Sequence, residues 1–410
     1  MRPTPALLGH AATALAELLK FARPADQALS AYFRNHRDLG QTDRAFVAEA
    51  VFAVLRRKRS LEAAAGSAAP RDLLVAALVR VFGLSARALE QDSALASRVK
   101  ASAGSSSLPA SVQADLPDWL WERLVAAYGE QESAAIALGL LGAAPLDLRV
   151  NLAKLSREDA LARLAPEGTP MTLSPAGIRM QGKPAINRHA LFLEGGIEVQ
   201  DEGSQLLAYL LAPRRGEMVA DFCAGAGGKT LAISMLMHGT GRIYAMDVSE
   251  KRLRELSPRA TRAGISNVHP IVLADEGDVR AKRLAGKLDR VLVDAPCSGF
   301  GTLRRNPDLK WRHGESAIGE LAAKQARILN AAAKLVKPGG RLVYATCSIL
   351  PDENEAVTDA FAAGHAEFRT LDCSELLAVQ RIPLDTGERL RLWPHRHGTD
   401  GFFAAAFERV

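Results

Sequence analysis

The chain has 410 residues, a formal net charge of +6 and an isoelectric point near 9.2. Its length predicts two or three folding units, since a domain usually holds about 100–200 residues. The composition, 48% hydrophobic and 24% charged, is that of a globular protein, and the longest uncharged apolar stretch, 134–146, is shorter than the roughly 18 residues of a membrane span. The mild positive charge is compatible with an anionic partner but does not establish one.

The N-terminus and the cysteine pattern indicate a soluble cytoplasmic protein. The first residues lack a signal-peptide pattern, and Glu17 and Lys20 beside a modest apolar stretch predict an amphipathic helix. Because the cysteines form no C-x-x-C pair and have no histidines at zinc-ligand spacing, we expect neither disulfides nor structural zinc. His395 and His397 are too few to indicate a metal site.

Residues 1 to about 130 are alanine-rich with a helical period, which predicts an all-helical domain. One apolar-striped helix, 44–55, ends in the basic run 56–59. That run either binds phosphates or complements the dipole of a solvated helix end, and the two interpretations have equal weight. The small, polar stretch 101–107 predicts a surface linker.

Residues 131–200 have mixed periods and predict a small α+β module. Residues 146–150 alternate like a strand, 157–164 have a helical period, and 190–199 are strand-like around a glycine turn at 195–196. From 201 onward strands alternate with helices, which predicts an α/β sheet. Its strands are expected near 217–222, 242–247, 268–273, 289–294 and 340–346, and the apolar piece 401–407 predicts a final edge strand.

A glycine-rich loop, 221–230, ends the first of these strands and opens a helix, where backbone amides can meet a ligand. A P-loop would need glycine in place of Cys223, and a dinucleotide fingerprint from Gly225 would need glycine or alanine in place of Thr230. Both nucleotide motifs therefore fail on spacing.

Acidic residues follow three successive strands. Asp247 ends the second strand and suits a ribose diol, Asp275 follows the third, and Asp294 ends the fourth. Any one of them alone is more often a helix cap or turn residue. The repeated placement instead predicts that they face one ligand site.

Two cysteines follow apolar runs typical of central parallel strands: Cys297 in Asp-Ala-Pro-Cys-Ser and Cys347 in Ala-Thr-Cys-Ser. Ligands lie beyond the carboxyl ends of such strands, so both thiols would face one crevice. A single free cysteine usually acts as a small buried hydrophobe, and we expect this of Cys373. The pair beside the glycine loop predicts a two-thiol active site.

Four segments, in chain order, closely resemble the Sun-type family of RNA cytosine-5 methyltransferases: 223–230, 294–298, 305–311 and 345–348. The family's glycine loop usually reads Cys-Ala-Ala-Pro-Gly-Gly-Lys. Here Gly225 and Ala226 replace the alanine and proline, which affects the rigidity of the loop more than its ligand. The resemblance implies a class I, Rossmann-like methyltransferase domain at 201–410, after a small α+β RNA-binding module at 131–200. Residues 1–130 resemble the all-helical NusB-like RNA-binding domain of bacterial members that act on ribosomal RNA.

The resemblance also implies S-adenosylmethionine as methyl donor. Its methionine and ribose end would contact Cys223, Ala224, Gly225, Ala226, Gly227, Gly228 and Lys229. Asp247 would bind the ribose, Asp275 would lie near the adenine, and Asp294 would contact both cofactor and base. Cytosine C5 is a poor nucleophile until a thiolate adds to C6. By family resemblance Cys347 is that nucleophile and Cys297 helps to remove the C5 proton.

The basic stretch after Cys297 is a candidate RNA contact, with Arg304, Arg305 and Lys310 beside Trp311, although Trp311 is equally typical of a core anchor. The target cytosine should be single-stranded or flipped out. We expect 16S ribosomal RNA as substrate and a monomer without a metal. The alternatives are a transfer RNA methyltransferase, a noncatalytic RNA-binding assembly factor, and a protein or small-molecule methyltransferase.

Overall fold

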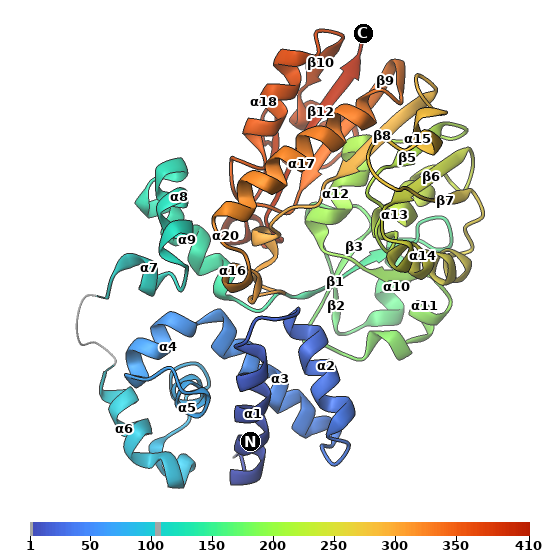
Figure 1. Cartoon of the computed structure of the whole chain (residues 1–410). Coiled ribbons are helices and arrows are strands. Elements are labelled where there is room, and N and C mark those ends of the chain that lie inside the picture. The colour runs from blue at the N-terminus through green and yellow to red at the C-terminus, as the bar shows by residue number, and fades with distance from the viewer. Residues whose placement is uncertain (1–2, 103–107) are drawn as a thin grey trace. The chain divides into compact units, whose positions relative to one another are not determined.

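The computed structural model describes residues 3–102 and 108–410, so most of the expected linker at 101–107 lies outside the described part (Figure 1). The chain forms two compact units. The helical unit comprises Met1–Ala143 and Thr302–Glu315, and the sheet unit comprises Ala144–Gly301 and Ser316–Val410. The expected domain boundaries at 130 and 200 differ from the limits of these two units, and they stay predictions. No helix in the described part is long and apolar enough to cross a membrane.

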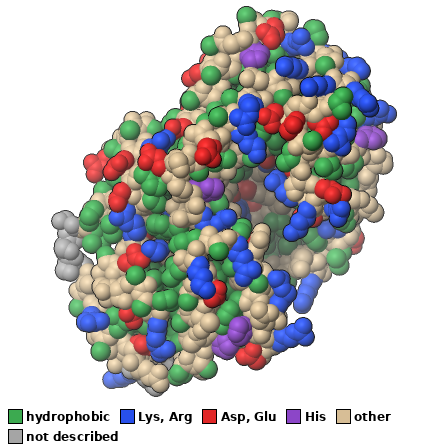
Figure 2. Space-filling model, in the orientation of Figure 1, with side chains coloured by type: hydrophobic (Ala, Val, Ile, Leu, Met, Phe, Trp, Pro, Cys, Tyr) green, Lys and Arg blue, Asp and Glu red, His purple; other side chains and the backbone are tan. Residues whose placement is uncertain are grey.

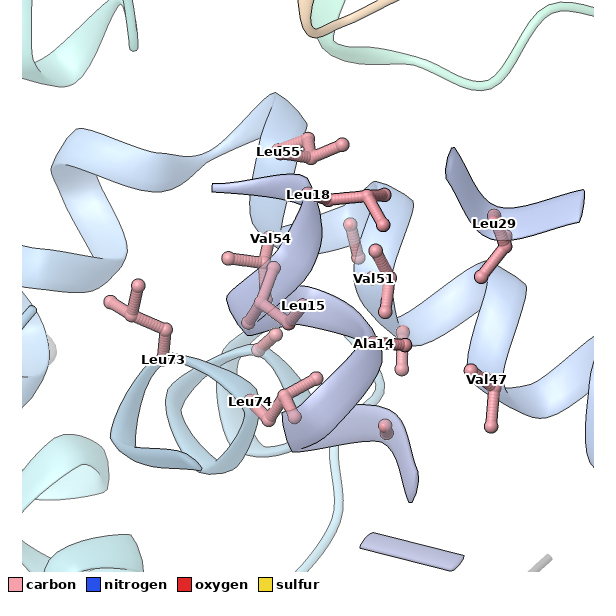
Figure 3. Packing of buried hydrophobic residues seen from close by; sticks show 14 of the residues in the cluster. Ala14, Leu15, Leu18, Leu29, Val47, Val51, Val54, Leu55, Leu73 and Leu74 are labelled. Atoms are coloured by element: carbon pink, nitrogen blue, oxygen red, sulfur yellow. The ribbon is translucent and has the colours of Figure 1, made fainter. Parts of the chain in front are cut away.

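Every regular element described in the helical unit is a helix, as predicted. The α-helices are α1 (Pro5–Leu18), α2 (Ala25–Asn35), α3 (Gln41–Arg56), α4 (Lys58–Ala65), α5 (Pro70–Arg80), α6 (Ser93–Ala101), α7 (Ala110–Gln113), α8 (Asp118–Tyr128), α9 (Glu130–Leu141) and α16 (Leu309–Arg312). The Thr4 hydroxyl accepts the Leu7 amide at the start of α1, and Pro5 occupies its first turn. Figure 3 shows the core between α1, α3 and α5.

The basic run 56–59 joins two helices. The backbone leaves helical geometry at Arg57, and α4 begins at Lys58. Arg59 donates to the Leu116 carbonyl at 2.6 Å and forms an ion pair with Asp118. The predicted helix end in this run is confirmed, because α3 ends at Arg56. A second helix follows at once, and Arg59 is engaged within the unit.

The sheet unit begins with a small antiparallel sheet in the order β2-β3-β1-β4. It contains β1 (Leu146–Val150), β2 (Gly168–Pro170), β3 (Gly177–Met180) and β4 (Ile197–Val199), together with α10 (Arg157–Leu164) and α11 (Ala190–Leu193). The strand at 146–150 and the helix at 157–164 are confirmed. The expected strand at 190–199 is wrong in its first part, because the His189 side chain caps a helical turn by accepting the Leu191 amide.

The large sheet has the order β10-β12-β9-β8-β5-β6-β7, with β11 paired to β12. Its strands are β5 (Met218–Asp221), β6 (Arg242–Asp247), β7 (Val268–Val272), β8 (Leu288–Asp294), β9 (Val336–Thr346), β10 (Phe368–Leu371), β11 (Leu390–Leu392) and β12 (Phe402–Arg409). The five predicted strands are confirmed as β5 to β9, and they pair in parallel. The expected edge strand, β12, instead lies between β9 and β10, consistent with the burial of Phe402 through Phe407.

The helices of the large sheet are α12 (Glu202–Leu211), α13 (Gly228–Leu236), α14 (Glu250–Ala263), α15 (Val279–Lys282), α17 (Ser316–Ala333), α18 (Glu355–Gly364), α19 (Cys373–Val379) and α20 (Pro394–His397). The strand order reverses at β5, which has β8 on one side and β6 on the other. Such a switch point leaves a crevice at the carboxyl ends of the strands. This topology predicts where a ligand binds.

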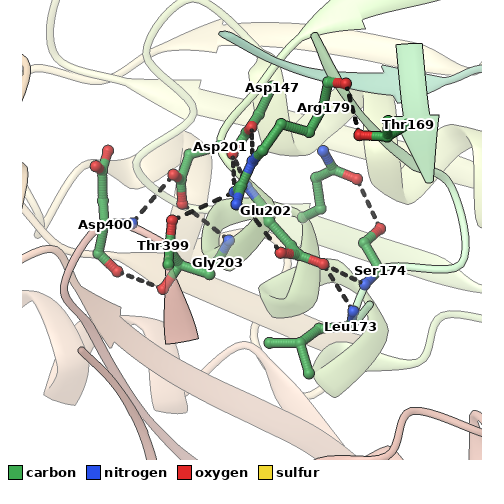
Figure 4. Close-up of polar contacts among 12 residues, drawn as sticks. Asp147, Thr169, Leu173, Ser174, Arg179, Asp201, Glu202, Gly203, Thr399 and Asp400 are labelled. Atoms are coloured by element: carbon green, nitrogen blue, oxygen red, sulfur yellow. Dashed lines mark hydrogen bonds and ion pairs between the residues drawn. The ribbon is translucent and has the colours of Figure 1, made fainter. Parts of the chain in front are cut away.

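A buried polar network joins the small sheet to the large one (Figure 4). Arg179 donates to both oxygens of the fully buried Asp147, at 2.8 and 2.9 Å, and to the Gly398 carbonyl at 3.3 Å. Glu202, at the start of α12, accepts the amides of Leu173 and Ser174 at 2.7 and 2.9 Å. These bonds fix α12 against the small sheet.

Charged side chains of both signs are interspersed on the face shown in Figure 2. Most of the ion pairs in the described part have at least one exposed or half-exposed partner, as in Arg163 with Glu194. Pairs of this kind contribute little stability. Because positive and negative side chains are mixed on this face, the positive net charge does not point to one binding surface.

We predict that Arg179→Met lowers the free energy of unfolding by about 3–5 kcal/mol, because it leaves the Asp147 carboxylate buried without its cation. Urea denaturation measures this loss. The control Arg163→Met breaks the exposed pair with Glu194 and should cost less than about 1 kcal/mol. Equal losses in the two variants would contradict the role given to the network.

Candidate active site

A cavity of about 340 Å³ lies at the switch point of the large sheet. Residues that end or follow four parallel strands line it: Phe222 and Cys223 after β5, Asp247 and Val248 at β6, Leu273 after β7, and Asp294 and Cys297 at β8. Cys347 follows β9, and α17 adds Lys324 and Ile328. The structure thus brings together the glycine loop, two of the three predicted acids and both predicted thiols.

The glycine loop is fixed by its neighbours although it lacks proline. Gly225 has a φ of +55° and donates its amide to Asp247 at 2.8 Å. Gly227 has a φ of +84°, and a Cβ there would lie 2.1 Å from a Leu256 methyl carbon. Arg259 donates to the Ala226 carbonyl at 2.6 Å. These contacts compensate for the freedom that the sequence gives the loop.

A buried arginine supports the same loop from the small sheet. Arg149, on β1, donates to the Gly228 carbonyl at 2.9 Å and to the side chain of Gln200. Burial lowers the pKa of Arg149 to about 10, against the opposing charge of Glu198. Because the guanidinium still stays charged at neutral pH, it holds the first turn of α13 on the α+β module.

The predicted acids have different positions. Asp247 is buried, and its two oxygens accept the amides of Gly225 and Ser249. Asp294 lines the cavity. Asp275 is exposed, accepts the Gly277 amide at 2.7 Å and is absent from the cavity lining, whereas its neighbour Glu276 is present. The adenine contact expected of Asp275 stays a prediction.

The two thiols are adjacent, with Cys297 Sγ 3.3 Å from Cys347 Sγ. The hydrogen bond with Cys347, burial and the charges of Glu353 and Asp294 raise the pKa of Cys297 well above its usual value. Cys297 therefore keeps its proton at neutral pH. This arrangement can place one thiol proton beside a sulfur nucleophile.

Lys229 and Asp294 form a short ion pair, with Nζ 2.6 Å from Oδ2. Burial lowers the pKa of Lys229, but the Asp294 carboxylate outweighs this effect and the net shift is upward. The ammonium also lies 5.8 Å from the centroid of the Phe402 ring. The loop thus delivers a fixed cation to the acid that ends β8.

A buried carboxyl, Asp221, lies under the loop. Its Oδ2 accepts the Thr230 hydroxyl at 2.7 Å, and no described residue bonds to its Oδ1. Burial raises the pKa of Asp221 to about 7, although the Thr230 hydrogen bond opposes this shift. Its charge therefore changes near neutral pH.

Sequence reasoning missed the residues that connect the two thiol loops. Glu353 accepts hydrogen bonds from the hydroxyls of Ser298 and Ser348, each at 2.5 Å. These serines directly follow Cys297 and Cys347. The acidic run 352–355 soon after Cys347 was the available signal, but nothing in its spacing indicated that one carboxylate reaches both loops.

The basic segment after Cys297 belongs to the helical unit. Lys310 is 3% exposed and donates to the Arg56 carbonyl at 2.8 Å, and the Trp311 indole N–H donates to the Leu55 carbonyl at 2.8 Å. Burial lowers the pKa of Lys310 to about 7, against the opposing charge of Asp115. Lys310 and Trp311 thus satisfy carbonyls at the end of α3.

The other two basic residues of that segment differ in exposure. Arg304 is buried, and its carbonyl accepts a hydrogen bond from Arg56 at 3.0 Å. Arg305 is half-buried. RNA contact by Arg304, Arg305 and Lys310 stays a prediction, and the observed burial favours a structural role for Arg304 and Lys310. Among the described residues no cluster of three or more His, Cys, Asp or Glu side chains could hold a metal ion.

Comparison with known families supports this site. Residues 208–408 match the model of the 16S rRNA methyltransferase RsmB/F family, and residues 116–187 match the ferredoxin-like domain of RsmF/B-like methyltransferases. The first match includes the cavity and both thiols. The second includes β1, β2, β3 and the helices α8 and α9 that precede them.

Individual relatives agree with the family models. The chain is 37% identical over 305 residues to the probable ribosomal RNA small subunit methyltransferase B of Synechocystis, covering 73% of this chain and 68% of that relative. Other curated relatives are covered over 64–66% of their length.

Solved structures have the same fold. One similar crystal structure is that of a protein called PH0851. Its sequence is 26% identical to this chain, and the two structures superpose with a TM-score of 0.79 over the full length of both chains. A methyltransferase homolog protein from Pyrococcus horikoshii is 30% identical, with a TM-score of 0.63, and covers 73% of this chain and 98% of its own.

We predict that Asp221→Asn stabilises the protein more at pH 8.5 than at pH 5.5. The folded carboxyl has its pKa raised from 3.8 to about 7, so the folded state binds the extra proton and wild-type stability falls as pH rises through this range. The neutral amide has no such loss and can still accept the Thr230 bond. The gain should be larger at pH 8.5 by about 2 kcal/mol, at 1.36 kcal/mol per pH unit.

Denaturant titrations of both proteins at the two pH values measure the difference. Asp275→Asn, which changes an exposed carboxylate in the same way, is the control and should show no pH-dependent gain. A gain from Asp221→Asn that is the same at both pH values would refute the proton linkage.

Proposed function

Because the chain belongs to the RsmB/F family of 16S rRNA methyltransferases, we propose that it methylates C5 of a cytosine in small-subunit ribosomal RNA through a covalent adduct at Cys347. The family uses S-adenosylmethionine as its methyl donor. The main support for this chemistry is the contact between the two thiols, 3.3 Å apart, in a cavity that Asp247 and Asp294 also line.

The residues around the cavity fit S-adenosylmethionine. Val248, Leu273 and Ile328 give apolar walls for an adenine ring. Asp247 suits the ribose hydroxyls, because each carboxylate oxygen keeps acceptor capacity beyond its one amide bond. When bound, the cofactor supplies an electrophilic methyl group.

Cys347 would activate the base by adding its sulfur to C6. The new S–C6 bond moves electron density onto N3 and C5 of the ring, which makes C5 nucleophilic. Asp294 can accept a hydrogen bond from the N4 amino group, and Lys229 holds this carboxylate in place. A charge-assisted bond of this kind in a partly buried site stabilises the adduct more than it would in water.

Release of the product needs two further bond changes: the C5 proton must leave, and the S–C6 bond must break. We assign proton removal to Cys297, the thiol next to the nucleophile. Its raised pKa means that it enters the reaction protonated. The two transfers would therefore be concerted: the Cys297 sulfur takes the C5 proton while its own proton passes to the Cys347 sulfur, the C5–C6 double bond re-forms and the S–C6 bond breaks.

We propose RNA contact for Arg305, which is half-buried. Lys310 and Trp311 would instead act by holding the segment 302–315 in the helical unit. The target base would be single-stranded or flipped, because a thiol cannot reach C6 inside a stacked duplex. The monomeric state and the cytoplasmic location stay predictions.

We predict that Cys297→Ala accumulates a covalent complex with RNA. In this variant Cys347 can still add to C6 and the methyl group can still be transferred, but release is blocked. Protein incubated with S-adenosylmethionine and 16S ribosomal RNA should give a slower band on a denaturing gel. The adduct should be absent in Cys297→Ala/Cys347→Ala.

Cys373→Ala is the matched control, because Cys373 is buried in the core and outside the cavity. It should methylate RNA like the wild type and accumulate no adduct. Parallel reactions with transfer RNA test the alternative substrate. An adduct that persists without Cys347, or a wild type that transfers no methyl group to either RNA, would refute the proposed chemistry.

A further inference from the structure

Glu353 is a fully buried carboxylate in the turn that follows β9, with 0% of its surface exposed. Its Oε1 accepts the Ser298 amide at 2.8 Å and the Gln325 side-chain amide at 3.0 Å. Its Oε2 accepts the hydroxyls of Ser298 and Ser348. All four donors are neutral, so this charge is stabilised by hydrogen bonds without an ion pair.

The four bonds connect the two loops that contain the thiols. Ser298 follows Cys297 at the end of β8, and Ser348 follows Cys347 at the end of β9. The two serine hydroxyls also lie 3.2 Å apart. The Gly301 amide also donates to the Cys347 carbonyl at 2.8 Å. The Glu353 carboxylate is thus the buried charged group that both thiol loops bind, beside these direct contacts between them.

The turn around Glu353 is itself fixed to β9. The Tyr344 hydroxyl donates to the Glu353 carbonyl at 2.6 Å. Asn354 accepts the Thr346 hydroxyl at 2.5 Å and donates to the Ser348 carbonyl at 3.1 Å. Since residues on both sides of Cys347 hold the turn, the carboxylate has little freedom to move away from the thiol loops.

The negative charge of Glu353 also acts on one thiol. It contributes to the raised pKa of Cys297, after the hydrogen bond to Cys347 and burial. A buried carboxylate costs several kcal/mol to desolvate, and a neutral acceptor of the same shape would avoid that cost. The charge of Glu353 therefore affects the pKa of Cys297 in addition to joining the two thiol loops.

We propose that Glu353 is a positioning residue that sets the distance between the Cys297 and Cys347 sulfurs. This inference rests on the proposed two-thiol reaction for its catalytic consequence. Its geometric part concerns the protein alone and can be measured without RNA.

Glu353→Gln is the informative variant because it keeps the shape and removes the charge. Its amide NH2 can only donate, so the two serine hydroxyls that now donate to Oε2 would have to reverse and accept. We expect kcat for methyl transfer to fall at least 100-fold, with KM for RNA and for S-adenosylmethionine within threefold of the wild type. A residue that only stabilised the fold would not give this split.

The distance between the thiols is probed with diamide, which takes two protons and two electrons from a pair of thiols and leaves a disulfide. Peptide mapping by mass spectrometry quantifies the bond between Cys297 and Cys347. In the wild type it should form fast, since the sulfurs are 3.3 Å apart. In Glu353→Gln the pKa of Cys297 falls, which favours the reactive thiolate and would speed the bond. We nevertheless expect a net slowing of about tenfold, which then reports the larger separation of the sulfurs.

Glu355→Gln is the matched control, since Glu355 lies two residues further on and pairs with Arg391 instead of the thiol loops. It should retain both rates. If Glu353→Gln does not fold, as judged by circular dichroism, Ser298→Ala/Ser348→Ala replaces it and should slow disulfide formation in the same way.

The outcomes separate the two proposals. An unchanged disulfide rate together with an unchanged kcat in the folded variant would overturn the role of Glu353. A wild type that does not methylate RNA, but whose disulfide rate depends on Glu353, would uphold the positioning and overturn the proposed reaction.

Discussion

The ion pair between Lys229 and Asp294 connects the two halves of the site. Lys229 comes from the glycine loop after β5 and Asp294 ends the neighbouring strand β8, so their 2.6 Å contact holds the cofactor side of the cavity against the side that contains the thiols. The contact is possible because β5 and β8 are parallel neighbours at the switch point. The contact between this cation and this acid gives the Asp294 carboxylate a fixed orientation.

Buried carboxylates fix the rest of the sheet unit. Asp147 is balanced by Arg179, Asp221 by a hydroxyl and a shifted pKa, and Glu353 by four neutral donors. Each arrangement costs desolvation, and each restricts a loop to one geometry because a buried charge has few alternative partners. The proposed reaction, from addition to release, needs two sulfurs, an acid and a ligand loop within a few ångströms of productive geometry. Rigid polar contacts of this kind supply that accuracy better than apolar packing alone.

Much of this site was predictable from local sequence, and the rest depends on contacts between distant segments. The strands β5 to β9 follow from apolar runs bounded by turns, and the parallel register then places Asp247, Asp294 and both cysteines at one edge. The interior position of β12 was missed because strand order is not encoded in the strand itself. Glu353 was missed because one of its partners, Ser298, lies in a loop 55 residues away. Asp275 and Glu276 are neighbours, and only the turn geometry decides which of them faces the cavity.

The chain passes between the two units three times, because the helical unit includes the segment Thr302–Glu315 as well as Met1–Ala143. After Cys297 the chain leaves the sheet unit, contributes residues 302–315 to the helical unit and returns at Ser316 to begin α17. Within that segment Lys310 and Trp311 bind carbonyls at the end of α3, and the Asp308 carboxylate accepts the Ala25 amide at the start of α2. The loop that contains a proposed catalytic thiol is thus continuous with a segment whose folding partners are the N-terminal helices. A change in those helices would remove the groups that satisfy the side chains of the 302–315 segment.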